Sequence, residues 1–78
     1  MSYMGNLVVE LIDYEEGNLD AAEEVNLFGR LIKSGFAWTL QGHYGRTAQA
    51  MIDAGFITAE GELDVVRLRE AGIDAVSV

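Results

Sequence analysis

Apolar residues recur at three- and four-residue steps through the first third of the chain, the spacing that places side chains on one face of a helix. The pattern predicts a first helix over about residues 5–16, with Gly5 or Asn6 to cap its start. Gly17 is expected to end this helix, because glycine readily adopts the left-handed conformation that follows a helix. The apolar stripe consists of Met4, Leu7, Val8, Leu11 and Ile12.

A second helix is predicted over residues 21–34, and its ends carry the clearest signals in the chain. Asp20 followed by Glu23 resembles a capping box, in which the Asp side chain accepts a hydrogen bond from a first-turn backbone N–H. Lys33 in the last turn and Gly35 after it are typical of a helix end. The broad apolar face consists of Ala21, Val25, Phe28 and Ile32, supported by Leu27 and Leu31.

Residues 36–54 predict a third helical element with a bend near Gly42. Its first part, residues 36–41, mixes helical and extended propensities and is expected to form a short helical turn. A helix follows over about residues 43–54, with Gly55 as its stop. The small residues that permit close approach of a neighbouring helix are Gly42, Gly45 and Ala48.

The C-terminal part allows two interpretations. Residues 56–66 could form a short β-hairpin around a glycine turn. The favoured alternative is a loop that presents Asp64 as the N-cap of a fourth helix over residues 64–71, which Gly72 would end. Residues 73–78 contain too little pattern to predict an element.

The length of 78 residues allows a single small helical domain over residues 1–78, an all-α bundle of three to four short helices. A chain of this size buries only about 60% of its unfolded surface, and without cysteine it has no disulfides. Half of its residues are nevertheless apolar, so we expect a homo-oligomer. No apolar run approaches the roughly 18 residues of a membrane span and no signal peptide opens the chain, so no membrane association is expected.

Acidic and basic residues lie in blocks along the chain, which has 13 acids, 5 bases and a formal net charge of −8. Residues 1–24 hold only acids, residues 25–51 only bases, and residues 52–78 mostly acids, with charges of −7, +3 and −4. Such blocks are usually solvated helix faces, but the central segment could instead meet an acidic surface, on its own flanks or on a partner. The acidity argues against direct nucleic-acid binding, which depends largely on Lys and Arg contacts to phosphates.

The residue types needed for catalysis or for a metal site are scarce. His43 is the single histidine, cysteine is lacking, and Ser2, Ser34 and Ser77 lie outside any nucleophile motif. Zinc requires three or four His, Cys or carboxylate ligands. The acidic segment 13–20 does not have the alternation of a calcium-binding loop. We therefore expect a protein that is not an enzyme and that uses no metal and no cofactor.

The glycine-punctuated run from Gln41 to Thr47 is the strongest candidate for a binding site. It opens a predicted helix and carries Arg46, and backbone N–H groups at a helix start together with an arginine suit an anion. Alternatively, the glycines allow a tight turn while Trp38 and Tyr44 pack inside, or the segment contacts a protein partner. The candidate residues for binding a protein partner or an anion are Trp38, Gln41, His43, Tyr44 and Arg46.

Residues 37–48 contain the fairly specific core Leu-Gln-Gly-x-Tyr-Gly-Arg, and residues 51–55 continue the pattern as Met-Ile-Asp-Ala-Gly. With residues 11–20 and 27–32, these stretches resemble a family of small proteins encoded by tailed bacteriophages, over about residues 4–57. That family has no assigned activity, so the resemblance implies no site residue. It implies a phage gene product that acts in the host bacterial cytoplasm.

The leading hypothesis is a non-catalytic phage protein that binds a host or phage protein and also self-associates. Large aromatic residues such as Phe36, Trp38 and Tyr44 could anchor such an interface. One alternative is that the acids of residues 10–24 imitate the phosphates of DNA and inhibit a DNA-binding protein. The other is a small anionic ligand bound with Arg46.

Overall fold

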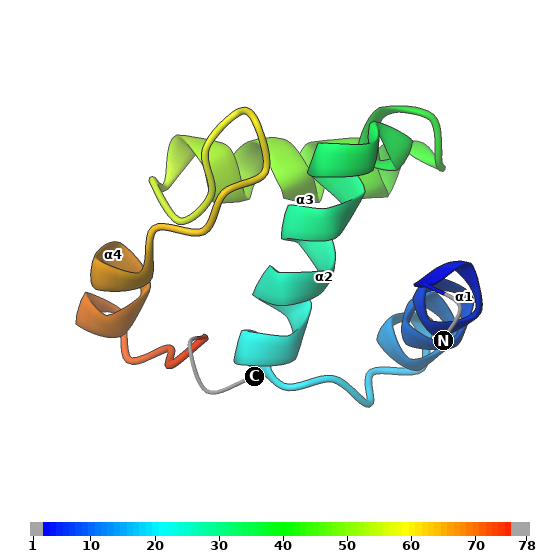
Figure 1. The fold of residues 1–78 in the computed structure, drawn as a ribbon, viewed down its shortest axis with the longest axis horizontal. Helices are drawn as coiled ribbons and strands as arrows, with labels where there is room; N and C mark the ends of the chain where they lie inside the picture. The colour runs from blue at the N-terminus through cyan, green and yellow to red at the C-terminus, as the bar shows by residue number, and fades with distance from the viewer. Residues whose placement is uncertain (1–2, 76–78) are drawn as a thin grey trace.

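The computed structural model describes residues 3–75, which form four α-helices and one 3-10 helix with no β-strand among them (Figure 1). The predicted all-α fold is confirmed. α2 runs through the middle of the molecule, with α1 on one side and α4 on the other, and α3 lies across its C-terminal end (Figure 1). The elements are α1 (Tyr3–Glu15), α2 (Ala21–Ser34), η1 (Phe36–Trp38), α3 (Gly42–Asp53) and α4 (Val65–Glu70).

α2 has the length and the ends that its sequence predicts. The Asp20 carboxylate accepts a hydrogen bond from the Glu23 N–H at 2.8 Å, and the Glu23 carboxylate accepts one from the Asp20 N–H at 2.9 Å. The predicted capping box is therefore present. Gly35 ends the helix with a φ of 84°, the left-handed conformation that favours glycine. The buried residues of α2 are Val25, Leu27, Phe28, Gly29, Leu31 and Ile32.

The core surrounds α2 and takes at least one buried side chain from each of the other elements. The Phe28 ring meets Tyr14 edge-on with 5.3 Å between ring centroids, and it stacks on Tyr44 at 6.1 Å. No polar or charged residue is buried among residues whose burial is described. The other elements and the loops contribute Leu7, Ala37, Ala48, Ile57, Leu68 and Ala75.

α1 begins earlier than predicted and buries only part of its apolar stripe. Because the helix starts at Tyr3, Gly5 and Asn6 lie inside it, and the prediction that one of them caps its start is wrong. Its end is as predicted, since Gly17 has a φ of 76°. Leu7 is buried and Leu11 half-buried, whereas Val8 and Ile12 are exposed; the side chain of Met4 lies outside the described part.

The bend expected near Gly42 is a full interruption. η1 ends at Trp38, residues 39–41 belong to no helix, and α3 starts at Gly42. Gln41 has a ψ of 153°, an extended conformation that turns the chain before α3. The interruption places the two aromatic residues differently: Tyr44 is 5% exposed, but Trp38 is 50% exposed and does not pack inside.

The C-terminal part forms the favoured loop and helix, with one feature of the alternative hairpin. Asp64 caps α4, its carboxylate accepting a hydrogen bond from the Arg67 N–H at 3.0 Å, and Gly72 follows the helix with a φ of 83°. Because Asp64 is the cap and Ala71 follows the last turn, α4 is shorter than the predicted 64–71. The hairpin is reduced to one antiparallel bridge between Ile57 and Leu63.

Candidate functional site

The residues after α2 form a short turn that packs on the start of α3. The Trp38 and Leu40 N–H groups donate to the Gly35 and Phe36 carbonyls at 3.2 and 3.0 Å, so local hydrogen bonds hold the turn. A Cβ added at Gly45 would lie 3.5 Å from the Ala37 carbonyl oxygen and 3.8 Å from Trp38 Cε3. Gly45 thus lies against η1 and the Trp38 ring, which is the close approach expected of this small residue.

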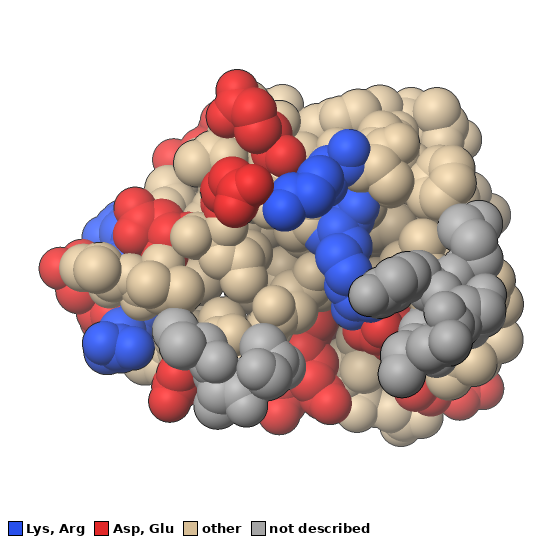
Figure 2. Space-filling model, in the orientation of Figure 1, with Lys and Arg blue, Asp and Glu red and all other residues tan. Residues whose placement is uncertain are grey.

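This turn exposes three large apolar side chains in five residues. Trp38 is 50% exposed, Phe36 is 37% exposed and Leu40 is 36% exposed. On the face shown in Figure 2, the surface over the turn that follows α2 carries no charged side chain, whereas Lys and Arg side chains lie over the middle of the molecule. We call Phe36, Trp38 and Leu40 the Trp38 patch.

Arg46 lies in the first turns of α3, directly after Gly45, the residue that lies against Trp38. A Cβ added at Gly42 would lie 3.1 Å from Arg46 Nη1, so the guanidinium group lies over the first residue of α3. Gln41, at the N-cap, makes no side-chain capping bond and is exposed. The first N–H groups of α3 and the Arg46 guanidinium could together contact one carboxylate.

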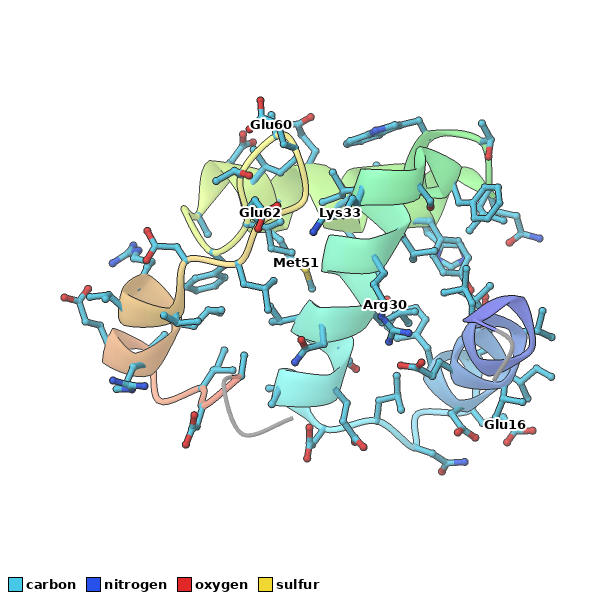
Figure 3. All side chains as sticks on the ribbon, viewed as in Figure 1. Glu16, Arg30, Lys33, Met51, Glu60 and Glu62 are labelled. Atoms are coloured by element: carbon cyan, nitrogen blue, oxygen red, sulfur yellow. The ribbon has the colours of Figure 1, made fainter. Side chains whose placement is uncertain are left out.

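The other two bases of residues 25–51 are occupied within the molecule. Arg30 pairs with Glu10 of α1, and the Lys33 Nζ lies 3.2 Å from Glu62 Oε2. Figure 3 shows Lys33 beside Glu62, and Arg30 on the side of α2 that faces α1. Within the described part of the chain, no carboxylate pairs with Arg46. The charge blocks therefore meet partly on the chain's own flanks, and Arg46 is the base of this segment that is left for another molecule.

His43 and Tyr44 connect α3 to the end of α1. The Tyr44 hydroxyl donates a hydrogen bond to the Glu15 carboxylate, and His43 Nε2 lies 3.6 Å from Glu15 Oε2. Burial, and secondarily the hydrogen bond to Glu15, raise the pKa of Tyr44 well above its usual value. Glu15 was not singled out in the sequence, because 29 residues separate it from Tyr44 and no local spacing relates them.

The structure thus divides the five candidate residues into two groups. Trp38, Gln41 and Arg46 are exposed, while Tyr44 is buried and the half-buried His43 faces Glu15. The exposed three lie around the 39–41 interruption and are available to a ligand. Phe36 and Leu40 join them as exposed apolar neighbours, and the aromatic composition of residues 36–44 was the signal that pointed to Phe36.

The acids of residues 10–24 do not form a free array. Glu10 pairs with Arg30, Glu15 accepts the hydrogen bond of Tyr44, and Asp20 and Glu23 cap α2. A surface that imitates the phosphates of DNA needs carboxylates that are free to meet a basic cleft. Most of these carboxylates have an internal partner instead.

Residues 3–75 lack the features of a metal site and of a membrane-spanning helix. No three His, Asp or Glu side chains of that range gather as a metal site requires. None of its helices combines the length and the apolar character needed to cross a bilayer.

Comparison with known proteins gives a family and no function. Neither the curated proteins nor the solved structures contain a match to this chain. The model of one family, described as a domain of unknown function (DUF7417), matches residues 1–75. Because this match covers nearly the whole chain, the protein belongs to the DUF7417 family.

Proposed function

We propose that this protein is non-catalytic and acts by binding another protein through the Trp38 patch and Arg46. The observation that carries the proposal is the exposure of Trp38, which is half exposed between two other exposed apolar residues. Tryptophan and arginine are the residue types that most often dominate binding energy at protein interfaces. Exposed apolar side chains that are contiguous, rather than scattered, are typical of an interaction site.

The chemistry of the patch defines the kind of partner that it fits. The partner would offer an apolar surface to Trp38 and a carboxylate to Arg46, whose guanidinium group has no ion-pair partner in residues 3–75. The resemblance to small proteins of tailed bacteriophages supports a host or phage protein in the bacterial cytoplasm as the partner. The two alternatives have weaker support, since the acids of α1 are largely paired and Arg46 at the start of α3 is exposed rather than enclosed in a pocket among the described residues.

The test compares matched pairs of variants in affinity capture from a bacterial lysate. The control for Trp38→Ala is Val66→Ala, which changes an exposed apolar residue of α4. The control for Arg46→Ala is Arg69→Ala, which changes an exposed arginine that also lies on α4. We expect the Trp38 and Arg46 variants to lose the captured protein, and the Val66 and Arg69 variants to retain it.

Thermal melting of each variant provides the control for folding. All four side chains are exposed, so we expect the variants to have melting temperatures close to that of the wild type. Capture that is equal in all four variants would refute the proposed site. If Trp38→Ala lowers the melting temperature strongly, the comparison of Arg46→Ala with Arg69→Ala carries the test.

A further inference from the structure

A second apolar surface lies on the outer side of α1. Val8 is 53% exposed, Val9 57% and Ile12 51%, although Leu7, Leu11 and Tyr14 of the same helix pack toward the core. Three aliphatic side chains, each at least half exposed on one short helix, are an unpartnered helix face. We call Val8, Val9 and Ile12 the outer face of α1.

The rim of this face is acidic. Asp13 follows Val9 by four residues, the step that keeps two side chains on the same side of a helix. Glu16 comes directly after the end of α1, and its N–H donates a hydrogen bond to the Ile12 carbonyl at 3.0 Å, so it lies one turn beyond Ile12. Residues 1–24 contain no Lys or Arg that could neutralise these acids locally. The outer face of α1 is therefore apolar with carboxylates beside it.

The surroundings of the Trp38 patch are basic instead of acidic. Arg46 follows Gly45, which lies against the Trp38 ring, and the segment from residue 25 to residue 52 contains no acid. Both surfaces are exposed in the described part of the molecule, so the chain does not cover one with the other. α1 and the turn after α2 nevertheless lie at the same end of the long axis of the molecule (Figure 1).

From these complementary surfaces we propose that a second copy of this chain places the outer face of its α1 on the Trp38 patch, and receives the same contact in return. This deepens the proposed function, on which it rests, by naming the chain itself as one occupant of that patch. Glu16 of each copy then lies near Arg46 of the other. Pairing of two α1 helices is less favoured, because it brings acids together without a base.

A reciprocal arrangement brings the contact closer to the area that a stable dimer needs. A specific interface usually buries more than about 1,000 Å² in total, or about 500 Å² per copy. The accessible surface of the chain is 4832 Å², so such an interface would cover roughly a tenth of it. One contact between two patches of three residues is small, and a two-fold dimer makes that contact twice. Dimerisation would then compete with binding of any other partner at Trp38.

Sedimentation velocity of purified variants at about 100 μM tests this contact. Ile12→Glu damages the outer face of α1, Trp38→Ala damages the Trp38 patch, and Val66→Glu places the same charge outside both surfaces. We expect the first two variants to dimerise about tenfold or more weakly and Val66→Glu to dimerise like the wild type. An equimolar mixture of Ile12→Glu and Trp38→Ala should dimerise more strongly than either variant alone, because the mixed dimer keeps one of its two contacts intact.

Charge reversal gives a second test if either of those variants fails to fold. Arg46→Glu should weaken the dimer, and mixing it with Glu16→Lys should restore association, since opposite charges then face each other in both contacts of the mixed dimer. A wild type that stays monomeric would overturn the copy contact, as would a mixture that associates no better than its single variants or a dimer lost in Val66→Glu. So would a dimer that survives Trp38→Ala but not Ile12→Glu, which would mean that α1 pairs with α1. In each of these cases the affinity capture of a partner through Trp38 is a separate measurement, so the proposed function is judged by the capture result and not by the dimer result.

Discussion

Gly61 occupies the most crowded backbone position among the described glycines. A Cβ at this residue would lie 2.6 Å from the Gly29 carbonyl oxygen and 2.8 Å from the Lys33 backbone nitrogen. The two glycines let the loop that contains the Ile57–Leu63 bridge lie directly on α2, because neither has a side chain to hold the two backbones apart. The sequence indicated Gly61 only as a turn residue, since nothing local relates it to Gly29.

We predict that Gly61→Ala destabilises the fold much more than Gly17→Ala. Both residues have a positive φ, 93° and 76°, so each substitution pays about 1 kcal/mol of backbone strain. Gly17 has no atom within 4 Å of the added Cβ, whereas at Gly61 the backbone of α2 must move. We expect a loss of about 3 kcal/mol or more for Gly61→Ala, measured by urea denaturation with Gly17→Ala as the control. Equal losses would mean that the loop does not lie against α2.

At the scale of elements, the sequence predicted what local chemistry decides. The caps of α2 and α4 follow from Asp20 and Asp64, whose carboxylates reach N–H groups three residues away. The exposure of Trp38 was not predictable in this way, because Trp38 and Tyr44 are both aromatic residues in a helical stretch. Which of them enters the core depends on how the turn at residues 39–41 orients α3 relative to η1. The candidate segment was therefore found, but its exposed and buried members were not separated.

The contact between α1 and α3 predicts an alkaline limit to stability. The unfolded chain releases the Tyr44 proton near pH 10, whereas the fold raises the pKa of this phenol and keeps it protonated. Stability from this group is therefore complete below pH 10 and is lost as the pH rises above that value, by at most about 1.4 kcal/mol per pH unit.

Urea denaturation of the wild type and Tyr44→Phe between pH 8 and about 11.5 measures this loss. At pH 8 we expect the variant to be less stable by about 1 kcal/mol, because Glu15 loses its hydrogen-bond donor. Above pH 10 the difference should shrink, since phenylalanine does not titrate. A difference that stays constant with pH would show that the Tyr44 pKa is ordinary in the folded state.

For the whole molecule, a core built around one central helix cannot take up all the apolar residues of the chain. α2 buries six of its residues, yet the short helices around it bury few each, and α1, η1 and α4 leave large apolar side chains exposed. Composition and length predicted this excess, since half of the 78 residues are apolar. They could not predict where the excess would lie, because that depends on how each short helix is rotated against α2.

If two copies cover these surfaces, the thermal stability of the wild type depends on its concentration. Association favours the folded state by mass action, by about 2.7 kcal/mol when the free chain is about 100 times above the dissociation constant. For a domain of this size each kcal/mol corresponds to about 4–8 °C, so the melting temperature should rise by several degrees between dilute and concentrated samples. The rise should be smaller at high salt, which screens the Arg46–Glu16 attraction, and nearly lost in Trp38→Ala. Differential scanning calorimetry over a concentration series measures it. A wild-type melting temperature that does not change with concentration would mean that a single chain is stable with its apolar surfaces exposed to water.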